Sequence, residues 1–311
     1  MSKRIPMYEW LAERKLARFV AGLAVTVLIA GIALFGSFNA VAQTETTGDW
    51  SASVHDKDGK IQLNFERRTE KNHRNQIGQS YQFSDLQGLT REQALSGGPV
   101  KFSLVREAGR IDCEGSFENG KGSGTYHFTG NPDFIAAMKS RGFDFEGSSR
   151  WGDSTENRLF SATALNVTTA LADDLTSAGF GKLDVEDLFK AAIFNIDSKF
   201  MREMKASGFP NLGMEELVKA RIFKIDPEFV REVAQIGFVK EPFESLVKMK
   251  IFKVTPEFIT EVRNEGLTDI HIEDLVKLRI FKIDSEFLRQ AKSEGVPMDV
   301  ERLVQRKIGV K

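Results

Sequence analysis

The stretch LVKLRIFKID, residues 275–284, decides the fold because related stretches recur at a fixed interval. These are LFKAAIFNID (188–197), LVKARIFKID (217–226) and LVKMKIFKVT (246–255), and each copy begins 29 residues after the one before. Such a period is typical of proteins built from repeated pairs of helices, in which every pair covers the apolar face of its neighbour. The sequence therefore predicts an α-solenoid of 29-residue helix-turn-helix repeats.

Each repeat is predicted to contain two short helices. The first begins after a capping residue such as Asp226 and ends near a glycine such as Gly237, which recurs in phase through the repeats. The second carries the repeated stretch, and the apolar residues of both helices are expected to face neighbouring repeats. Residues predicted at these contacts are Phe229, Val230, Val233, Leu246, Val247, Ile251, Phe252, Leu275, Val276, Ile280 and Phe281.

The period also divides the chain into segments. Residues 167–311 hold five repeats, and residues 130–166 hold an imperfect first repeat with a loop insertion. Residues 43–129 instead alternate apolar and polar side chains, as in IQLNF (61–65), which is typical of strands with one buried face. This segment predicts a small antiparallel β domain of about six strands, with a partly helical insertion near residues 84–98. The predicted fold class is α+β, a small antiparallel β domain followed by the α-solenoid.

One glycine-rich stretch of the β domain has a spacing that could be mistaken for a nucleotide site. GSFENGKGS (115–123) resembles a phosphate-binding loop in the glycines that precede Lys121. However, Gly122 occupies the position of the usual Ser or Thr, and strand patterns lie on both sides where the loop needs a following helix. The dipeptide Asn119-Gly120 favours a tight hairpin turn, so the stretch predicts a hairpin and no bound nucleotide.

The cysteine and histidine residues of the sequence do not indicate a metal site or a nucleophilic catalytic site. The single cysteine, Cys113, excludes an intrachain disulfide, and its place in an alternating run predicts a packing role. The histidines show no metal-binding spacing and do not suggest a catalytic triad, so the sequence predicts no cofactor, no metal and no enzymatic activity. The histidines are His55, His73, His127 and His271.

The N-terminal residues 1–42 have the pattern of an export signal. Several basic residues precede the uncharged apolar segment 19–36, and Ala40 and Ala42 fit a cleavage site. Two interpretations remain open, a signal peptide cut after Ala42 or an uncleaved anchor that contacts the membrane through residues 19–36. Either places residues 43–311 outside the cytoplasm, in the periplasm or anchored at the inner membrane.

Charge is distributed locally rather than globally. The formal net charge of −1 gives no overall attraction to nucleic acid, but basic residues recur in phase along the repeats. The three predicted columns are Lys219, Lys248 and Lys277 (first), Arg221, Lys250 and Arg279 (second), and Lys224, Lys253 and Lys282 (third); acidic residues also align at Glu203, Glu232 and Glu261. Two interpretations are open, a solvated face with internal ion pairs or a ridge for an anionic partner. Because aromatic residues do not alternate with these lysines, no nucleic-acid partner is expected.

Part of the chain resembles a known family. The run FSLVREAGRIDCEGSFENGKGSGTYHFTGNPDFIAAMKSRGF (102–143), with DPEFVREVAQIGF (226–238) and TPEFITEVRNEGL (255–267), resembles the non-catalytic extracytoplasmic region attached to some bacterial BlaR1-like M56 membrane metallopeptidases. The resemblance covers roughly residues 80–311 and implies a bacterial envelope protein. The peptidase motif His-Glu-x-x-His does not occur in the chain, so no catalytic residue is carried over.

The functional prediction combines these observations. A non-enzymatic envelope protein is expected, an interaction scaffold or binding module whose partner is a protein or another anionic envelope component. The alternative is an accessory or regulatory sensor domain related to M56-type membrane peptidase systems.

Overall fold

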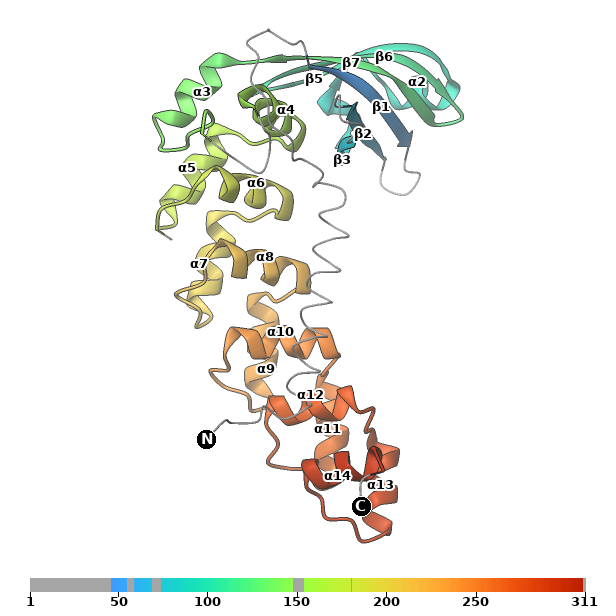
Figure 1. Cartoon of the computed structure of the whole chain (residues 1–311), viewed down its shortest axis with the longest axis vertical. Coiled ribbons are helices and arrows are strands. Elements are labelled where there is room, and N and C mark those ends of the chain that lie inside the picture. Colours follow the sequence, from blue (N-terminus) through green and yellow to red (C-terminus); the bar gives the residue numbers. More distant parts are fainter. Residues whose placement is uncertain (1–45, 55–58, 69–73, 148–153, 180, 310–311) are drawn as a thin grey trace. The chain divides into compact units, whose positions relative to one another are not determined.

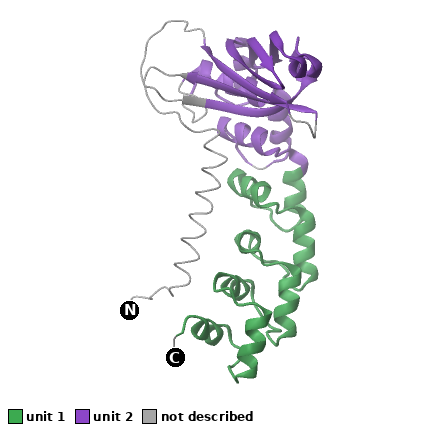
Figure 2. Ribbon diagram, turned by 90° about the vertical axis from the view of Figure 1, so that its right-hand side faces the viewer, with its two compact units in different colours: residues 1–22, 200–311 green, residues 23–199 purple. Residues whose placement is uncertain are grey.

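A computed structural model describes residues 46–309, apart from residues 55–58, 69–73, 148–153 and 180. The predicted leader, residues 1–42, lies outside the described residues. The fold is α+β, an antiparallel sheet followed in sequence by helices (Figure 1). It divides into two compact units, whose described parts are residues 46–199 and residues 200–309 (Figure 2). Among the described residues, no helix has the length and apolarity that a membrane crossing requires.

The sheet contains seven strands in the order β3-β2-β1-β7-β6-β5-β4, and all neighbouring strands are antiparallel. The prediction of about six strands is one short, because β4 is only two residues long and lies inside the predicted insertion. That insertion is partly helical, as predicted. The strands are β1 (Thr46–Val54), β2 (Lys60–Arg68), β3 (Arg74–Gln82), β4 (Leu86–Gln87), β5 (Gly98–Arg106), β6 (Gly109–Glu118) and β7 (Lys121–Gly130); the insertion adds a 3₁₀ turn (Phe83–Asp85) and α2 (Arg91–Ser96).

The hairpin between β6 and β7 confirms the turn prediction. Asn119 and Gly120 both have positive φ, 50° and 75°, which is the combination that a two-residue turn between antiparallel strands requires. Glu118 and Lys121 pair directly across this turn. The glycine-rich stretch is therefore a hairpin, with no helix following it to hold a phosphate.

Trp50 anchors one part of the sheet core. Its side chain is 2% exposed, and its Nε1 donates a hydrogen bond of 3.1 Å to the Glu114 carbonyl. The Phe102 ring packs edge-on against it, with centroids 5.1 Å apart. Gly115 lies beneath the indole, where a Cβ atom would come within 2.7 Å of the Trp50 ring. The absence of a side chain at residue 115 thus lets the indole lie against the backbone.

Cys113 lies on β6, buried among these side chains at 1% exposure, which confirms its packing position. Burial raises the pKa of the Cys113 thiol, so the group stays protonated and unreactive at neutral pH. We expect a thiol reagent to modify the native chain slowly, at a rate set by unfolding, and to modify the chain at once in denaturant. Rapid modification of the native chain, followed by absorbance or mass spectrometry, would contradict this placement.

The first helices pack in the same unit as the sheet. Phe160 from α4 inserts among three aromatic rings of the sheet, with centroid distances of 5.8 Å to Phe65, 5.3 Å to Tyr126 and 5.4 Å to Phe128. The Tyr81 hydroxyl on β3 donates a hydrogen bond of 2.8 Å to the backbone carbonyl of Ala164. The helices of this unit are α3 (Pro132–Lys139), α4 (Thr155–Leu165), α5 (Thr169–Ser177) and α6 (Val185–Phe194).

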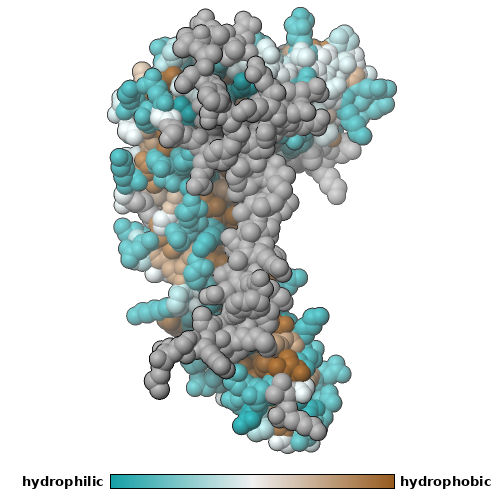
Figure 3. Space-filling view, viewed as in Figure 1, coloured by the Kyte–Doolittle hydropathy of each residue, from teal (hydrophilic) through white to brown (hydrophobic). Residues whose placement is uncertain are grey.

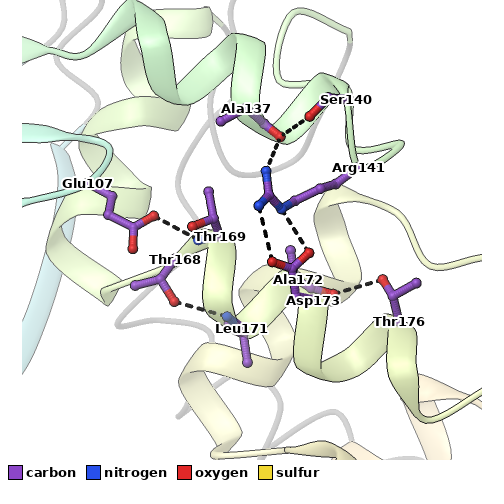
Figure 4. A network of polar contacts seen from close by, with 10 residues as sticks. All are labelled: Glu107, Ala137, Ser140, Arg141, Thr168, Thr169, Leu171, Ala172, Asp173 and Thr176. Carbon is purple, nitrogen blue, oxygen red and sulfur yellow. Dashed lines mark hydrogen bonds and ion pairs between the residues drawn. The ribbon is translucent and has the colours of Figure 1, made fainter.

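A polar network joins the sheet to α5 and α5 to α3 (Figure 4). Glu107, in the turn between β5 and β6, accepts a 2.8 Å hydrogen bond from the backbone N–H of Thr169 at the start of α5. A carboxylate suits this position because a helix N-terminus carries partial positive charge. Arg141, just after α3, forms two parallel bonds with Asp173, of 2.8 Å and 3.1 Å. The sheet thus fixes the first helices through both apolar and charged contacts.

Helix pairs recur with the predicted period from α7 onward, and the division between the two units falls within α7. The first helices start at Ser198, Pro227, Pro256 and Ser285, which are 29 residues apart. The pairs are α7 (Ser198–Ala206) and α8 (Met214–Phe223), α9 (Pro227–Gln235) and α10 (Phe243–Phe252), α11 (Pro256–Asn264) and α12 (Ile272–Ile280), and α13 (Ser285–Ser293) and α14 (Val300–Lys307). Within the second unit α8 contacts α10, α10 contacts α12, α12 contacts α14, and α11 contacts α13.

The helix boundaries follow from local chemistry, as predicted. Asp226 caps α9, because its carboxylate accepts a 2.8 Å hydrogen bond from the Phe229 N–H, and Thr255 caps α11 in the same way. Gly237 and Gly266, which follow these helices, have φ of 99° and 115°, a conformation that glycine adopts without strain.

The predicted packing residues are confirmed in part. Phe229, Val233, Leu246, Val247, Leu275 and Val276 are buried. Val230, Ile251, Phe252, Ile280 and Phe281 are half-buried, so they lie at the edge of the packed interior. After α10 and α12 the chain turns, and the backbone N–H groups of Val254 and Ile283 bond back to the carbonyls of Met249 and Leu278. Val254 and Ile283 are themselves buried. Both lie outside the helical pattern that the sequence periodicity describes.

Candidate interaction surface

The first basic column takes part in ion pairs within the protein. Each lysine reaches a glutamate on the next second helix along the chain, 24 or 25 residues later. The N···O distances are 2.7 Å for Lys219–Glu244, 2.9 Å for Lys248–Glu273 and 2.8 Å for Lys277–Glu301. This regular ladder supports the interpretation that the first column links successive helices.

A double-mutant cycle can measure one rung of this ladder. For Lys248→Met and Glu273→Gln, we expect a coupling free energy of about 0.2–1 kcal/mol, because the pair is only partly buried. Salt screens such a pair, so the coupling should shrink in concentrated salt. Chemical denaturation of the four proteins provides the measurement, and strictly additive single effects would show that the rung does not stabilise the fold.

The second basic column stacks on aromatic rings. The guanidinium carbon of Arg221 lies 3.7 Å from the centroid of the Phe200 ring, and that of Arg279 lies 3.7 Å from the centroid of Phe258. Lys250 places its Nζ 3.6 Å from the centroid of Phe229. Each contact joins the second helix of a repeat to the first helix of the same repeat, and a cation over a ring face is attracted by the ring electrons.

Burial in these contacts affects the charges themselves. Desolvation lowers the pKa of Lys250 and that of Arg279, while the acidic residues Glu232 and Glu261, from the predicted acidic column, act in the opposite direction. The positive charge of Lys224 also lowers the pKa of Lys250. The second column therefore takes part mainly in contacts within the protein.

The third column differs from the other two in both exposure and backbone conformation. Lys224, Lys253 and Lys282 are all exposed, and no ion pair within the described part of the chain reaches them. Each directly follows the apolar end of a second helix and has a φ of 55°, 55° or 53°. Asn166 and Asn195 have the same conformation at the ends of α4 and α6.

Lysine is an unfavourable residue at such a position. A left-handed conformation costs a residue with a Cβ atom roughly 1–2 kcal/mol, whereas asparagine adopts it more readily. The end of a second helix does not require lysine at this position, since Asn195 has the same left-handed conformation at the end of α6, one repeat earlier. Three locally unfavourable lysines without an ion-pair partner suggest a role outside folding.

Replacing Lys253 by asparagine tests whether the lysine contributes to folding. We expect the free energy of unfolding to stay the same or rise by up to about 1 kcal/mol, because the backbone strain is relieved and no described contact is lost. Lys253→Val should lower it, because a branched side chain opposes positive φ. Denaturant titration of both variants is sufficient, and a clear loss of stability in Lys253→Asn would show that Lys253 serves the fold.

The described residues contain no group of three or more His, Cys, Asp or Glu side chains arranged to hold a metal ion. His127 lies on β7 and His271 immediately precedes α12, while His55 and His73 fall outside the described residues. The glutamates of the ladder and the phenylalanines under the second column were not anticipated from the sequence. A glutamate recurring 25 residues after a lysine, as Glu244 follows Lys219, was the available signal.

Comparison with protein-family models, with curated proteins and with solved structures finds no match to this chain.

Proposed function

We propose that this chain is a non-enzymatic interaction scaffold of the bacterial envelope, in which residues 167–311 form an α-solenoid of 29-residue repeats that binds an anionic partner. Its recognition surface is the third basic column, Lys224, Lys253 and Lys282. The envelope location rests on the export pattern of residues 1–42 and on the resemblance to the extracytoplasmic region of M56-type systems.

The conformation of the third column is the observation that carries the proposal. The first column has internal glutamate partners, and the second has internal aromatic partners. Of the three columns, only the third combines exposure with a backbone conformation that lysine disfavours. Locally unfavourable backbone conformations cluster at binding and switch sites, so this conformation supports a role for these lysines in binding.

The solenoid arrangement is supported by the recurrence of contacts with the repeat period. The lysine–glutamate ladder and the cation–ring contacts each recur in successive helix pairs. Within the second unit, neighbouring second helices contact one another in chain order. In such an array stability is the sum of repeat and nearest-neighbour terms, and the exposed positions align along one side.

Binding of heparin, used as a soluble polyanion, tests the proposal. The triple variant Lys224→Asn, Lys253→Asn, Lys282→Asn should bind about tenfold more weakly than the parent, because three exposed charge contacts of 0.2–1 kcal/mol each are lost. Binding by the parent should also weaken steeply with added salt. The variant should unfold at the same denaturant concentration as the parent or at a higher one, because asparagine adopts the left-handed conformation more readily than lysine.

The matched control is a variant that loses three positive charges outside the three basic columns. Lys121, Lys182 and Lys240 are exposed lysines outside the three columns. Their triple asparagine variant should bind heparin nearly as well as the parent. Equal weakening by both triple variants would mean that only net charge matters, and the third column would then not be the recognition surface.

A further inference from the structure

We infer that the partner of the third column is an acidic amphipathic α-helix that lies along the row of second-helix ends. This inference rests on the proposed function and identifies the chemistry of its partner. It depends on a second property of the same helix ends, which is that each lysine directly follows a pair of half-buried apolar residues.

The apolar pairs recur with the lysines. Each pair lies at the end of a second helix, with Phe281 as the residue that follows α12, and the described structure leaves these side chains partly open to solvent. In the helical part of the chain, hydrophobic surface is visible between the hydrophilic side chains (Figure 3). The pairs are Ile222 and Phe223, Ile251 and Phe252, and Ile280 and Phe281.

The apolar pairs and the third-column lysines together favour a partner that has both apolar and acidic side chains. A polyanionic glycan would pair with Lys224, Lys253 and Lys282 but would gain nothing from isoleucine and phenylalanine. An apolar peptide without charge would leave the lysines unpaired. A helix with an apolar stripe and an adjacent acidic stripe satisfies both rows at once.

The spacing of the rows favours a helix over an extended strand. Packed helices lie about 8–10 Å apart, which sets the distance between successive lysines along the stack. Seven residues of an α-helix rise about 10 Å and return to nearly the same face, so acidic residues at every seventh position could meet each lysine in turn. A strand covers this distance in about three residues, and because its side chains alternate, successive contacts would point to opposite faces.

Two synthetic peptides of about 20 residues test the inference with the full chain. One carries glutamate at every seventh position beside a leucine stripe, and the other has the same composition in scrambled order. We expect the patterned peptide to bind at least about tenfold more tightly and to gain helical circular dichroism on binding. The third-column asparagine variant should weaken this binding about tenfold.

A second variant addresses the apolar row. Ile222→Gln, Ile251→Gln and Ile280→Gln together should weaken the patterned peptide but leave heparin binding unchanged. Denaturant unfolding of this variant and of its three single substitutions checks that the fold persists. The Lys240→Asn protein is the control, because Lys240 is exposed and has a φ of 62° but lies outside the column.

The possible outcomes separate this inference from the proposed function. Equal binding of the patterned and scrambled peptides would overturn the amphipathic helix while leaving an anion-binding column in place. Vesicles of phosphatidylglycerol that bind through the third column, when the patterned peptide does not bind, would replace the helix by a lipid surface. If neither heparin, nor either peptide, nor the vesicles depend on these lysines, the proposed function fails as well.

Discussion

Replacing Phe258 by alanine is expected to lower the free energy of unfolding by about 3–5 kcal/mol, the range for truncating a buried aromatic side chain. Phe258 is 2% exposed, and the guanidinium carbon of Arg279 lies 3.7 Å from the centroid of its ring. The substitution therefore opens a cavity and removes the surface on which a half-buried cation rests. Because small proteins are stable by only about 5–15 kcal/mol, this single change removes a large fraction of the total.

The matched control is Val239→Ala, because Val239 is 64% exposed. That change should alter stability by less than about 0.5 kcal/mol.

Hydrogen exchange of Phe258→Ala gives a second measurement, which tests the coupling between repeats. If the repeats are coupled as proposed, Phe258→Ala should reduce protection in α9 and α10 as well as in α11 and α12. Loss confined to α11 and α12 would mean that each helix pair is stable by itself.

The second large effect is expected at the junction between α4 and the sheet. Phe160→Ala should cost about 3–5 kcal/mol, because the ring is 8% exposed and touches three aromatic rings of the sheet. Near-ultraviolet circular dichroism should change with it, since Tyr126 loses its stacked partner at 5.3 Å.

Val105→Ala provides the control within the same unit, because Val105 on β5 is 37% exposed. Denaturation followed by far- and near-ultraviolet circular dichroism measures both variants. A loss below about 1 kcal/mol in Phe160→Ala would show that α4 adds little to the sheet core and would contradict a stabilising role for the Phe160 contacts.

Local features of the fold were predictable because local chemistry determines them. An aspartate followed by proline, as at Asp226, both caps a helix and supplies a suitable first residue. The Asn119-Gly120 dipeptide specifies a hairpin turn through its tolerance of positive φ. The 29-residue spacing of helix pairs is visible in the sequence itself, because equivalent helices have similar residues.

Features that depend on distant contacts were not predictable in the same way. The strand order places β1 beside β7, so residues near 50 meet residues near 124, and no periodicity in the sequence encodes that pairing. Ile251 and Phe252 are half-buried, whereas Val254, which lies beyond the end of α10, is buried. A helical pattern alone assigns all apolar residues of one face to the core.

The positions of the basic columns were predictable from the sequence, but the different contacts of the three columns were not. Periodicity grouped nine basic residues but could not rank them, because the glutamate and phenylalanine partners come from other helices. The third column carried a local signal, since the copies that end in FNID and FKID exchange asparagine for lysine at Asn195 and Lys224. Asparagine is typical of left-handed positions, so this exchange marks the lysines as residues in an unfavourable conformation.

Lysine acetylation footprinting of the full chain, with and without the patterned acidic peptide, tests the central claim most directly. The rate at each lysine, read by mass spectrometry, reports whether a bound partner covers it. We predict that the peptide slows acetylation of Lys224, Lys253 and Lys282 and leaves Lys121 and Lys240 unchanged. Protection of Lys121 or Lys240 instead, or equal protection at all five, would contradict the assignment of the third column as the recognition surface.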